Sequence, residues 1–97
     1  MIGKAPGVEV KFHGGLQKVF QEKVKQVELS KAPNIRRLFD VLCSSPERRR
    51  ELLNDHGHIR SDLTIFRNGR NIEFLGSLDT ELNNGDTIAI FLPVYGG

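Results

Sequence analysis

The sequence predicts an α+β domain in which one mixed sheet of about five strands carries a main helix on one face, together with a short second helix. Three features predict this class. An alternating apolar and charged stretch opens the chain, a helical apolar stripe follows in residues 35–42, and a strongly β-forming run occupies residues 86–92. Between the stripe and the last run, Asn68-Gly69 is a strong signal for a tight hairpin.

The first hairpin is predicted from residues 8–29. Residues 1–7 contain two glycines and a proline and are predicted to be a flexible lead-in. Residues 8–12 alternate, which favours a strand with Val8, Val10 and Phe12 facing the core. A turn at residues 13–15 then leads to a less regular second stretch, residues 16–29, in which Val27 and Leu29 are expected to face inward.

Two helices are expected next. Asn34 is a good N-cap, because its side chain can accept from the free N–H groups of the first turn. The apolar residues that follow recur at helical spacing and are Ile35, Leu38, Phe39 and Leu42. Ser45-Pro46 predicts a second, short surface helix, with Ser as cap and Pro at the first helical position. The basic run at residues 48–50 is interpreted as its solvated face.

The second half predicts three more strands. Residues 62–67 and 70–74 flank the Asn68-Gly69 turn, residues 76–82 connect onward with Leu78 and Leu82 inward, and residues 83–86 form a turn. In the last strand, Ile88 and Ile90 would face the core, whereas Phe91 would face outward. If this strand lies parallel to the first, the arrangement is a β-grasp domain. Its predicted extent is residues 1–92.

The last five residues, 93–97, are predicted to form a flexible arm. Pro93 has no N–H for the ladder and therefore ends the strand. The arm reaches about 16–18 Å when extended, and Gly96 and Gly97 leave its tip without a side chain. Two interpretations remain open at this point. The arm enters a deep, narrow site on a partner, or it is an ordinary frayed terminus.

Composition narrows the setting and the partners. A formal net charge of +2 is too small to indicate a nucleic-acid partner. No apolar run approaches the roughly 20 residues of a membrane span, and the N-terminal residues lack the apolar core of a secretory signal. The single cysteine, Cys43, excludes an internal disulfide and fits a reducing compartment. These features predict a cytoplasmic protein.

Other candidate sites carry less weight. His56 and His58 flank Gly57, but no third metal ligand is evident, so no metal is expected. Cys43 lies at the end of the helical stripe, lining the core or partly exposed, without a base to activate it. Phe91 is of more interest, because an outward aromatic beside the arm suggests a docking patch, with Phe66 or Phe74 as a neighbour. The alternative is a scattered surface apolar residue.

The motifs together resemble the MoaD/ThiS group of ubiquitin-like proteins and the small archaeal modifier proteins, over nearly the whole chain. Two departures are visible. Chains of this group typically end in Pro-Val-Ala-Gly-Gly, so Tyr95 stands at a usually small position, and Leu92 stands where proline is common. The motifs that carry the resemblance are residues 34–38 (Asn-Ile-Arg-Arg-Leu), Asn68-Gly69, residues 84–86 (Asn-Gly-Asp) and residues 93–97 (Pro-Val-Tyr-Gly-Gly).

The resemblance implies a chemistry that belongs to a partner. An ATP-dependent adenylyltransferase of the MoeB/ThiF type joins AMP to the terminal carboxylate, here that of Gly97. Sulfur then displaces AMP to give a thiocarboxylate, or a lysine amine displaces it to give an isopeptide bond. Gly97 would carry the reacting carbonyl, Gly96 would pass through the partner's channel, Pro93 would fix where the arm departs, and Val94 and Tyr95 would offer apolar surface.

On this interpretation the chain is a carrier or substrate protein and not an enzyme. It binds no cofactor, and ATP is used by the activating partner. Later partners would be lysines of target proteins or a MoaE-like subunit. Sulfur carrier and protein modifier both remain open, as do a dedicated small subunit of molybdopterin synthase and a β-grasp interaction module that never reacts.

Overall fold

A computed structural model describes residues 5–92 of the 97-residue chain. Five strands form one sheet in the order β2-β1-β5-β3-β4. The strands are β1 (Gly7–Gly14), β2 (Val24–Glu28), β3 (Thr64–Arg67), β4 (Arg70–Asn71) and β5 (Thr87–Leu92). The helical elements are α1 (Leu16–Phe20), α2 (Ile35–Leu42), α3 (Pro46–Leu52) and the 3₁₀ turns η1 (Ile72–Phe74) and η2 (Ser77–Asp79).

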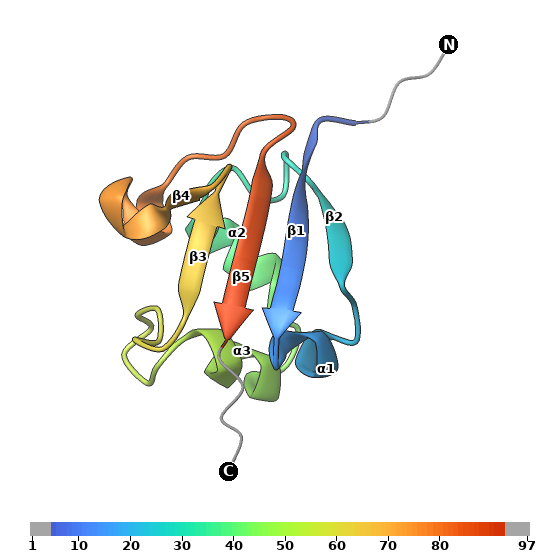
Figure 1. The fold of residues 1–97 in the computed structure, drawn as a ribbon. Helices are drawn as coiled ribbons and strands as arrows, with labels where there is room; N and C mark the ends of the chain where they lie inside the picture. Colours follow the sequence, from blue (N-terminus) through green and yellow to red (C-terminus); the bar gives the residue numbers. More distant parts are fainter. Residues whose placement is uncertain (1–4, 93–97) are drawn as a thin grey trace.

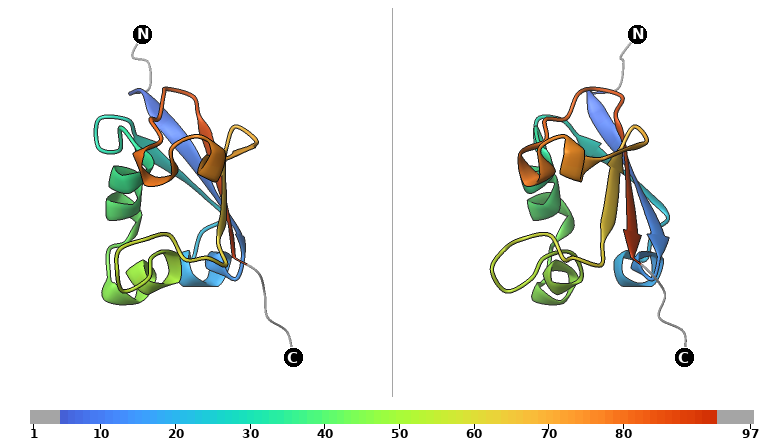
Figure 2. Two further views of the ribbon diagram at one scale, coloured as in Figure 1. Left: turned by 90° about the vertical axis from the view of Figure 1, so that its left-hand side faces the viewer. Right: turned by 60° about the vertical axis from the view of Figure 1, so that its left-hand side comes forward.

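The topology confirms the predicted β-grasp. The first and last strands, β1 and β5, pair in parallel, and every other neighbouring pair is antiparallel. α2 lies across one face of the sheet, and α1 and α3 close the end at which β1 and β5 finish (Figures 1 and 2). Among residues 5–92, no helix covers the other face of the sheet (Figure 2).

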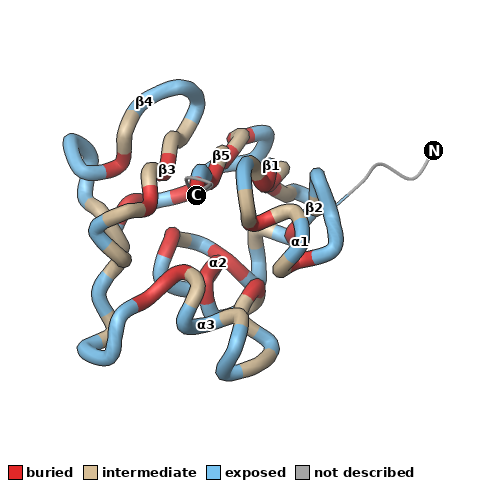
Figure 3. The backbone as a smooth tube through the Cα atoms, turned by 60° about the horizontal axis from the view of Figure 1, so that its bottom comes forward, coloured by how far each residue is buried: buried red, intermediate tan, exposed pale blue. Residues whose placement is uncertain are grey.

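The core lies between the sheet and α2, as the predicted patterns require. The four apolar residues of the helical stripe, Ile35, Leu38, Phe39 and Leu42, are all buried. The Asn34 side chain caps α2 by accepting from the Arg37 N–H at 2.9 Å. Figure 3 shows buried residues both on the sheet and on α2. The residues of the sheet that share the buried core with this stripe are Val8, Val10, Phe12, Val27, Ile65, Ile88 and Ile90.

The two turn motifs meet in space and hold the start of β5. Asn68 and Gly69 both have positive φ, as the predicted tight turn requires. Asp86, which is 5% exposed, accepts from Asn68 Nδ2 and from Arg67 Nε, both at 2.8 Å. It also accepts from the Asn83 N–H at 2.7 Å. A single buried carboxylate therefore ties the β3–β4 turn to the entry of β5.

The predicted second strand over residues 16–29 is wrong in its first part. Leu16–Phe20 is the short helix α1, and only Val24–Glu28 pairs with β1. Leu16 and Phe20 are both buried in the core, which the spacing of a one-turn helix allows, and the Phe20 ring stacks on Phe12 at 4.6 Å. Tertiary packing therefore decides the conformation of this segment. Leu29, predicted to face inward, is only partly buried against the core.

Several boundaries also differ from the prediction, among them the start of β3, which is Thr64 and not residue 62. β1 continues through His13 and Gly14, which pair with Phe91 and Leu92, so the turn begins later than residue 13. The return strand predicted for residues 70–74 stops at Asn71, and Ile72–Phe74 is the 3₁₀ turn η1. The Asn71 side chain accepts from the Glu73 N–H at 2.9 Å, which favours a turn over a continued strand.

The described residues contain no helix that is both long enough and apolar enough to cross a membrane.

Candidate functional site: the end of strand β5

The sequence-predicted arm begins where the described part of the chain ends. The roles expected of Pro93, Val94, Tyr95, Gly96 and Gly97 concern residues outside 5–92. Leu92 is the last described residue, and its side chain is buried. The site is therefore built from the elements that hold the end of β5 and from the surface beside it.

β5 is the central strand of the sheet. It pairs with β1 through six residue positions and with β3 through four. Its last residue is also held by the β1–α1 connection. Gly15 donates its N–H to the Leu92 carbonyl at 3.3 Å, and a Cβ atom at Gly14 would overlap that same carbonyl oxygen. Gly14 also has a φ of +65°, so glycine is required there for two reasons.

Three aromatic rings gather on the open face of the sheet beside this end. We call His13, Phe66 and Phe91 the aromatic triad. The His13 and Phe91 rings stack with centroids 4.3 Å apart and an interplanar angle of 7°. Phe66 meets Phe91 edge-on, with centroids 5.7 Å apart and an angle of 89°. Both contacts have the geometry that aromatic pairs prefer.

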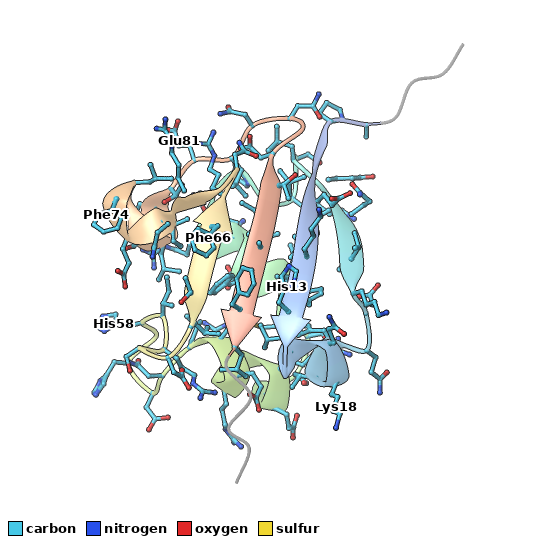
Figure 4. All side chains as sticks on the ribbon, in the orientation of Figure 1. His13, Lys18, His58, Phe66, Phe74 and Glu81 are labelled. Atoms are coloured by element: carbon cyan, nitrogen blue, oxygen red, sulfur yellow. The ribbon has the colours of Figure 1, made fainter. Side chains whose placement is uncertain are left out.

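The triad gives the predicted outward Phe91 a defined setting. Phe91 remains 38% exposed although it touches two rings. Of its two candidate neighbours, Phe66 is in contact, whereas Phe74 belongs to η1 at the far edge of the molecule and is 84% exposed (Figure 4). Sequence reasoning missed His13, because its contact with Phe91 follows from the parallel register of β1 and β5. That register is a long-range property of the fold.

The open face next to the triad carries a separate charged pair. Lys11 and Glu9 on β1 lie 3.7 Å apart, and Gln26 on β2 donates to the Glu9 carboxylate at 3.1 Å. Exposed pairs of this kind add little stability. The triad is thus an apolar patch bordered on the β1 side by polar groups, which is the usual composition of a protein-docking surface.

The residues considered for reactivity or metal binding, Cys43, His56 and His58, lie at a helix end and in a loop. Cys43 is the C-cap of α2 and is partly buried. Burial raises the pKa of its thiol to about 11, so little thiolate is present near neutral pH. The His56 and His58 rings lie 6.4 Å apart in a loop organised by the Asn54 side chain, which accepts from both backbone N–H groups. Within residues 5–92, no group of three potential ligands could hold a metal ion.

A cavity of about 380 Å³ lies on the other side of β3. Its apolar lining comes from Leu63, Ile65, Ile72 and other core-edge residues, and its rim includes the Arg36–Asp79 ion pair at 3.0 Å. None of the triad residues lines it. The cavity is therefore separate from the surface beside the end of β5.

The chain is similar to known proteins in both sequence and structure. A model of the ThiS family matches residues 10–97. Small archaeal modifier protein 3 of Haloferax volcanii is 33% identical over 45 residues, which are 46% of this chain and 49% of that protein. A putative sulfur carrier protein of Archaeoglobus fulgidus is 36% identical over 47 residues, which are 48% of this chain and 53% of that protein. The chain thus spans about half the length of the curated relatives it matches.

The fold has close counterparts among solved structures. The crystal structure of SAMP1 from Haloferax volcanii superposes with a TM-score of 0.76, covering 94% of this chain and 99% of that one. The two sequences are 23% identical, so this likeness supports the fold alone.

Proposed function

The chain belongs to the ThiS family, and we propose that its Gly97 carboxylate is activated by an ATP-dependent adenylyltransferase and then carries sulfur or is conjugated to lysines. The observation that carries this proposal is the family match, which extends from β1 through residues 93–97. The two curated relatives, a modifier and a putative sulfur carrier, support the same pair of outcomes.

The proposed chemistry needs an activated acyl group. A free carboxylate is a poor electrophile, because the leaving group would be oxide. In the first step a Gly97 carboxylate oxygen attacks the α-phosphate of ATP, and pyrophosphate leaves. In the second step a sulfur nucleophile or a lysine amine attacks the Gly97 carbonyl carbon, and AMP leaves with the bonding electrons. The first nucleophile gives a thiocarboxylate and the second an isopeptide bond.

This chain's own residues would present the acyl group and not catalyse its reaction. Gly97 would carry the reacting carbonyl, and Gly96 would let the backbone pass between the walls of the enzyme's channel. Pro93 would end β5 and set where the arm departs. Val94 and Tyr95 would supply apolar contact along the channel. ATP would bind to the enzyme, so no cofactor site is assigned to this chain.

The aromatic triad would be the docking surface for the activating enzyme. Phe91 lies two positions before Pro93, so an enzyme that takes the arm must approach this end of the sheet. Phe91 is partly exposed, and partly exposed aromatic side chains are typical anchors of protein interfaces. We assign the partner to the MoeB/ThiF type of adenylyltransferase, followed by lysines of target proteins or a MoaE-like subunit.

The test is an intact-mass measurement. The chain is incubated with the adenylyltransferase of its own host, ATP and a sulfur donor. A mass change equal to one oxygen replaced by one sulfur supports a carrier, and covalent ladders on an immunoblot support a modifier. Both products should vanish when Gly96 and Gly97 are deleted. If the deletion variant keeps every partner and activity, the domain is a non-reacting interaction module and the proposal fails.

A further inference from the structure

Three exposed cations that form no ion pair with any described residue lie on or beside α1 and α3, the helices at the end of the molecule where β5 finishes (Figure 1). Gly15, whose N–H donates to the Leu92 carbonyl, directly precedes α1. α1 in turn packs against α3. Lys18 on α1 is exposed and points away from the domain at this end (Figure 4). Lys23, after α1, and Arg50, on α3, are exposed as well. We call Lys18, Lys23 and Arg50 the basic rim.

The basic rim is not neutralised from within the domain. Across the described residues, no carboxylate forms an ion pair with Lys18, Lys23 or Arg50. Two neighbouring charges are already paired elsewhere, since Arg49 pairs with Asp40 at 3.6 Å and Glu22 pairs with Lys25 at 3.7 Å.

The two segments beside the end of β5 have an excess of basic residues. Residues 15–24 and 44–53 together contain five lysines and arginines but three acidic residues. The rest of the sequence contains nine of each kind. The two segments beside the end of β5 therefore carry a formal net charge of +2, and the remaining residues sum to zero.

We propose that the enzyme that receives the arm presents acidic side chains around the mouth of its channel, opposite the basic rim, and an apolar surface opposite the aromatic triad. This inference rests on the proposed function, because it names the chemistry of that partner's surface. Charged groups at the edge of an interface mainly raise the association rate, whereas buried aromatic anchors mainly slow dissociation. The two parts of the surface thus have separable kinetic effects.

An acidic protein surface fits the basic rim better than a nucleic acid does. A nucleic-acid footprint needs many cations along the phosphate backbone, and each released counterion steepens the salt dependence. Here the cations are few, and Glu22, Glu47 and Glu51 lie among them in sequence. Alternating charge of this kind repels a continuous phosphate chain but can match a patterned protein surface.

The test compares two double charge reversals with the same change in net charge. Lys18→Glu/Lys23→Glu alters the basic rim. The control, Lys31→Glu/Arg70→Glu, alters two exposed cations that also have no ion pair among the described residues and lie in the β2–α2 connection and in β4. Association and dissociation rates with the adenylyltransferase are measured at about 0.05 M and about 0.5 M salt, which brackets strong and weak screening.

The rim variant should associate about 10-fold more slowly at low salt and within about 2-fold of wild type at high salt. The control should match wild type at both. Phe91→Ala should instead raise the dissociation rate and leave the salt dependence unchanged. Equal rates for the rim variant and the control would overturn the inference. So would binding of bulk tRNA at physiological salt that the rim variant loses and the control keeps.

Adenylation of the wild-type chain is measured in parallel by ATP–pyrophosphate exchange. If exchange is absent, the proposed function fails and this inference fails with it. If exchange is normal while the rim variant and the control associate alike, only the acidic channel mouth is refuted. Retained circular dichroism and unfolding midpoints check that both variants fold.

Discussion

Removal of the Asp86 carboxylate should be among the most damaging single changes to this fold. Asp86→Ala takes away the acceptor that joins the β3–β4 turn to the start of β5. Three donors lose their partner: Arg67 Nε, Asn68 Nδ2 and the Asn83 N–H. Because β5 leads directly to residues 93–97, the change also tests how firmly the scaffold holds the strand before the arm.

The magnitude follows from the hydrogen bonds and the burial. A hydrogen bond to a charged group contributes about 1.5–3 kcal/mol, and a buried donor left without a partner costs about 1–3 kcal/mol. The Arg67 side chain is 24% exposed and can regain water, which reduces the loss. We therefore expect Asp86→Ala to lower the free energy of unfolding by about 2–4 kcal/mol.

The direction in which the fold shifts the pKa of Asp86 determines how its contribution to the free energy of unfolding changes with pH. Burial raises the pKa of Asp86. Hydrogen bonds from the Asn83 N–H, Asn68 and Arg67 lower the pKa by more than burial raises it, so the net pKa lies below its ordinary value. A lowered folded-state pKa gives stability that is fully present above the unfolded pKa of about 3.9. That contribution is lost as the pH falls through the folded pKa. The difference between wild type and Asp86→Ala should therefore be constant near neutral pH and shrink below about pH 4.

The assay is urea unfolding of wild type, Asp86→Ala and a control, Asp79→Ala, between about pH 3 and pH 7. Asp79 forms an ion pair with Arg36 in which the two side chains are 80% and 53% exposed, so its loss should be within about 0.5 kcal/mol. If Asp86→Ala lowers the free energy of unfolding by less than about 0.5 kcal/mol at pH 7, the inferred role of Asp86 in joining the β3–β4 turn to β5 is refuted. A buried carboxylate that accepts three hydrogen bonds should contribute more than that. A difference that grows as the pH falls would refute the sign.

Three further outcomes are expected. Leu38→Ala should lower the free energy of unfolding in urea by about 2–5 kcal/mol, because this side chain is fully buried under the sheet. The control Arg37→Ala, one position away and exposed, should leave the free energy of unfolding nearly unchanged. Gly97→Ala should leave the unfolding midpoint unchanged but slow adenylation in the exchange assay, and unchanged exchange would contradict a narrow channel. Cys43 should be alkylated slowly by iodoacetamide at pH 8, since its raised pKa of about 11 leaves roughly 100-fold less thiolate than an ordinary thiol with a pKa of 9.0. Denaturation should restore normal labelling, and fast labelling of the folded chain would contradict the burial.

Sequence patterns predicted the elements whose signals are local. The α2 stripe repeats over two turns, and its cap, Asn34, adjoins it, so both were visible in one short window. The Asn68-Gly69 turn needs two positive φ angles, which few other residue pairs supply. The β-forming residues of β5 and their inward and outward alternation were equally local.

The differences arise where tertiary contacts override weak local signals. α1 is one turn long, too short to be stable on its own, and exists because Leu16 and Phe20 fill the core. η1 replaces a strand because the Asn71 side chain bonds the backbone two residues on. The sequence predicted His13 only as part of a turn, and its place in the aromatic triad depends on pairing with a strand more than 70 residues later.

The parallel pairing of β1 and β5 would make one end of this sheet suitable for presenting the proposed arm. Parallel neighbours finish at the same end, so β1 brings His13 beside Phe91 and brings the Gly14–Gly15 connection against the Leu92 carbonyl. An antiparallel neighbour such as β3 begins at this end and contributes Phe66 from its interior instead. Because β5 has a neighbour on each side, force applied to residues 93–97 would be shared by two ladders and not by an exposed edge. The same topology therefore anchors the strand and assembles the proposed docking surface, and a variant that weakens the β1–β5 ladder should impair both together.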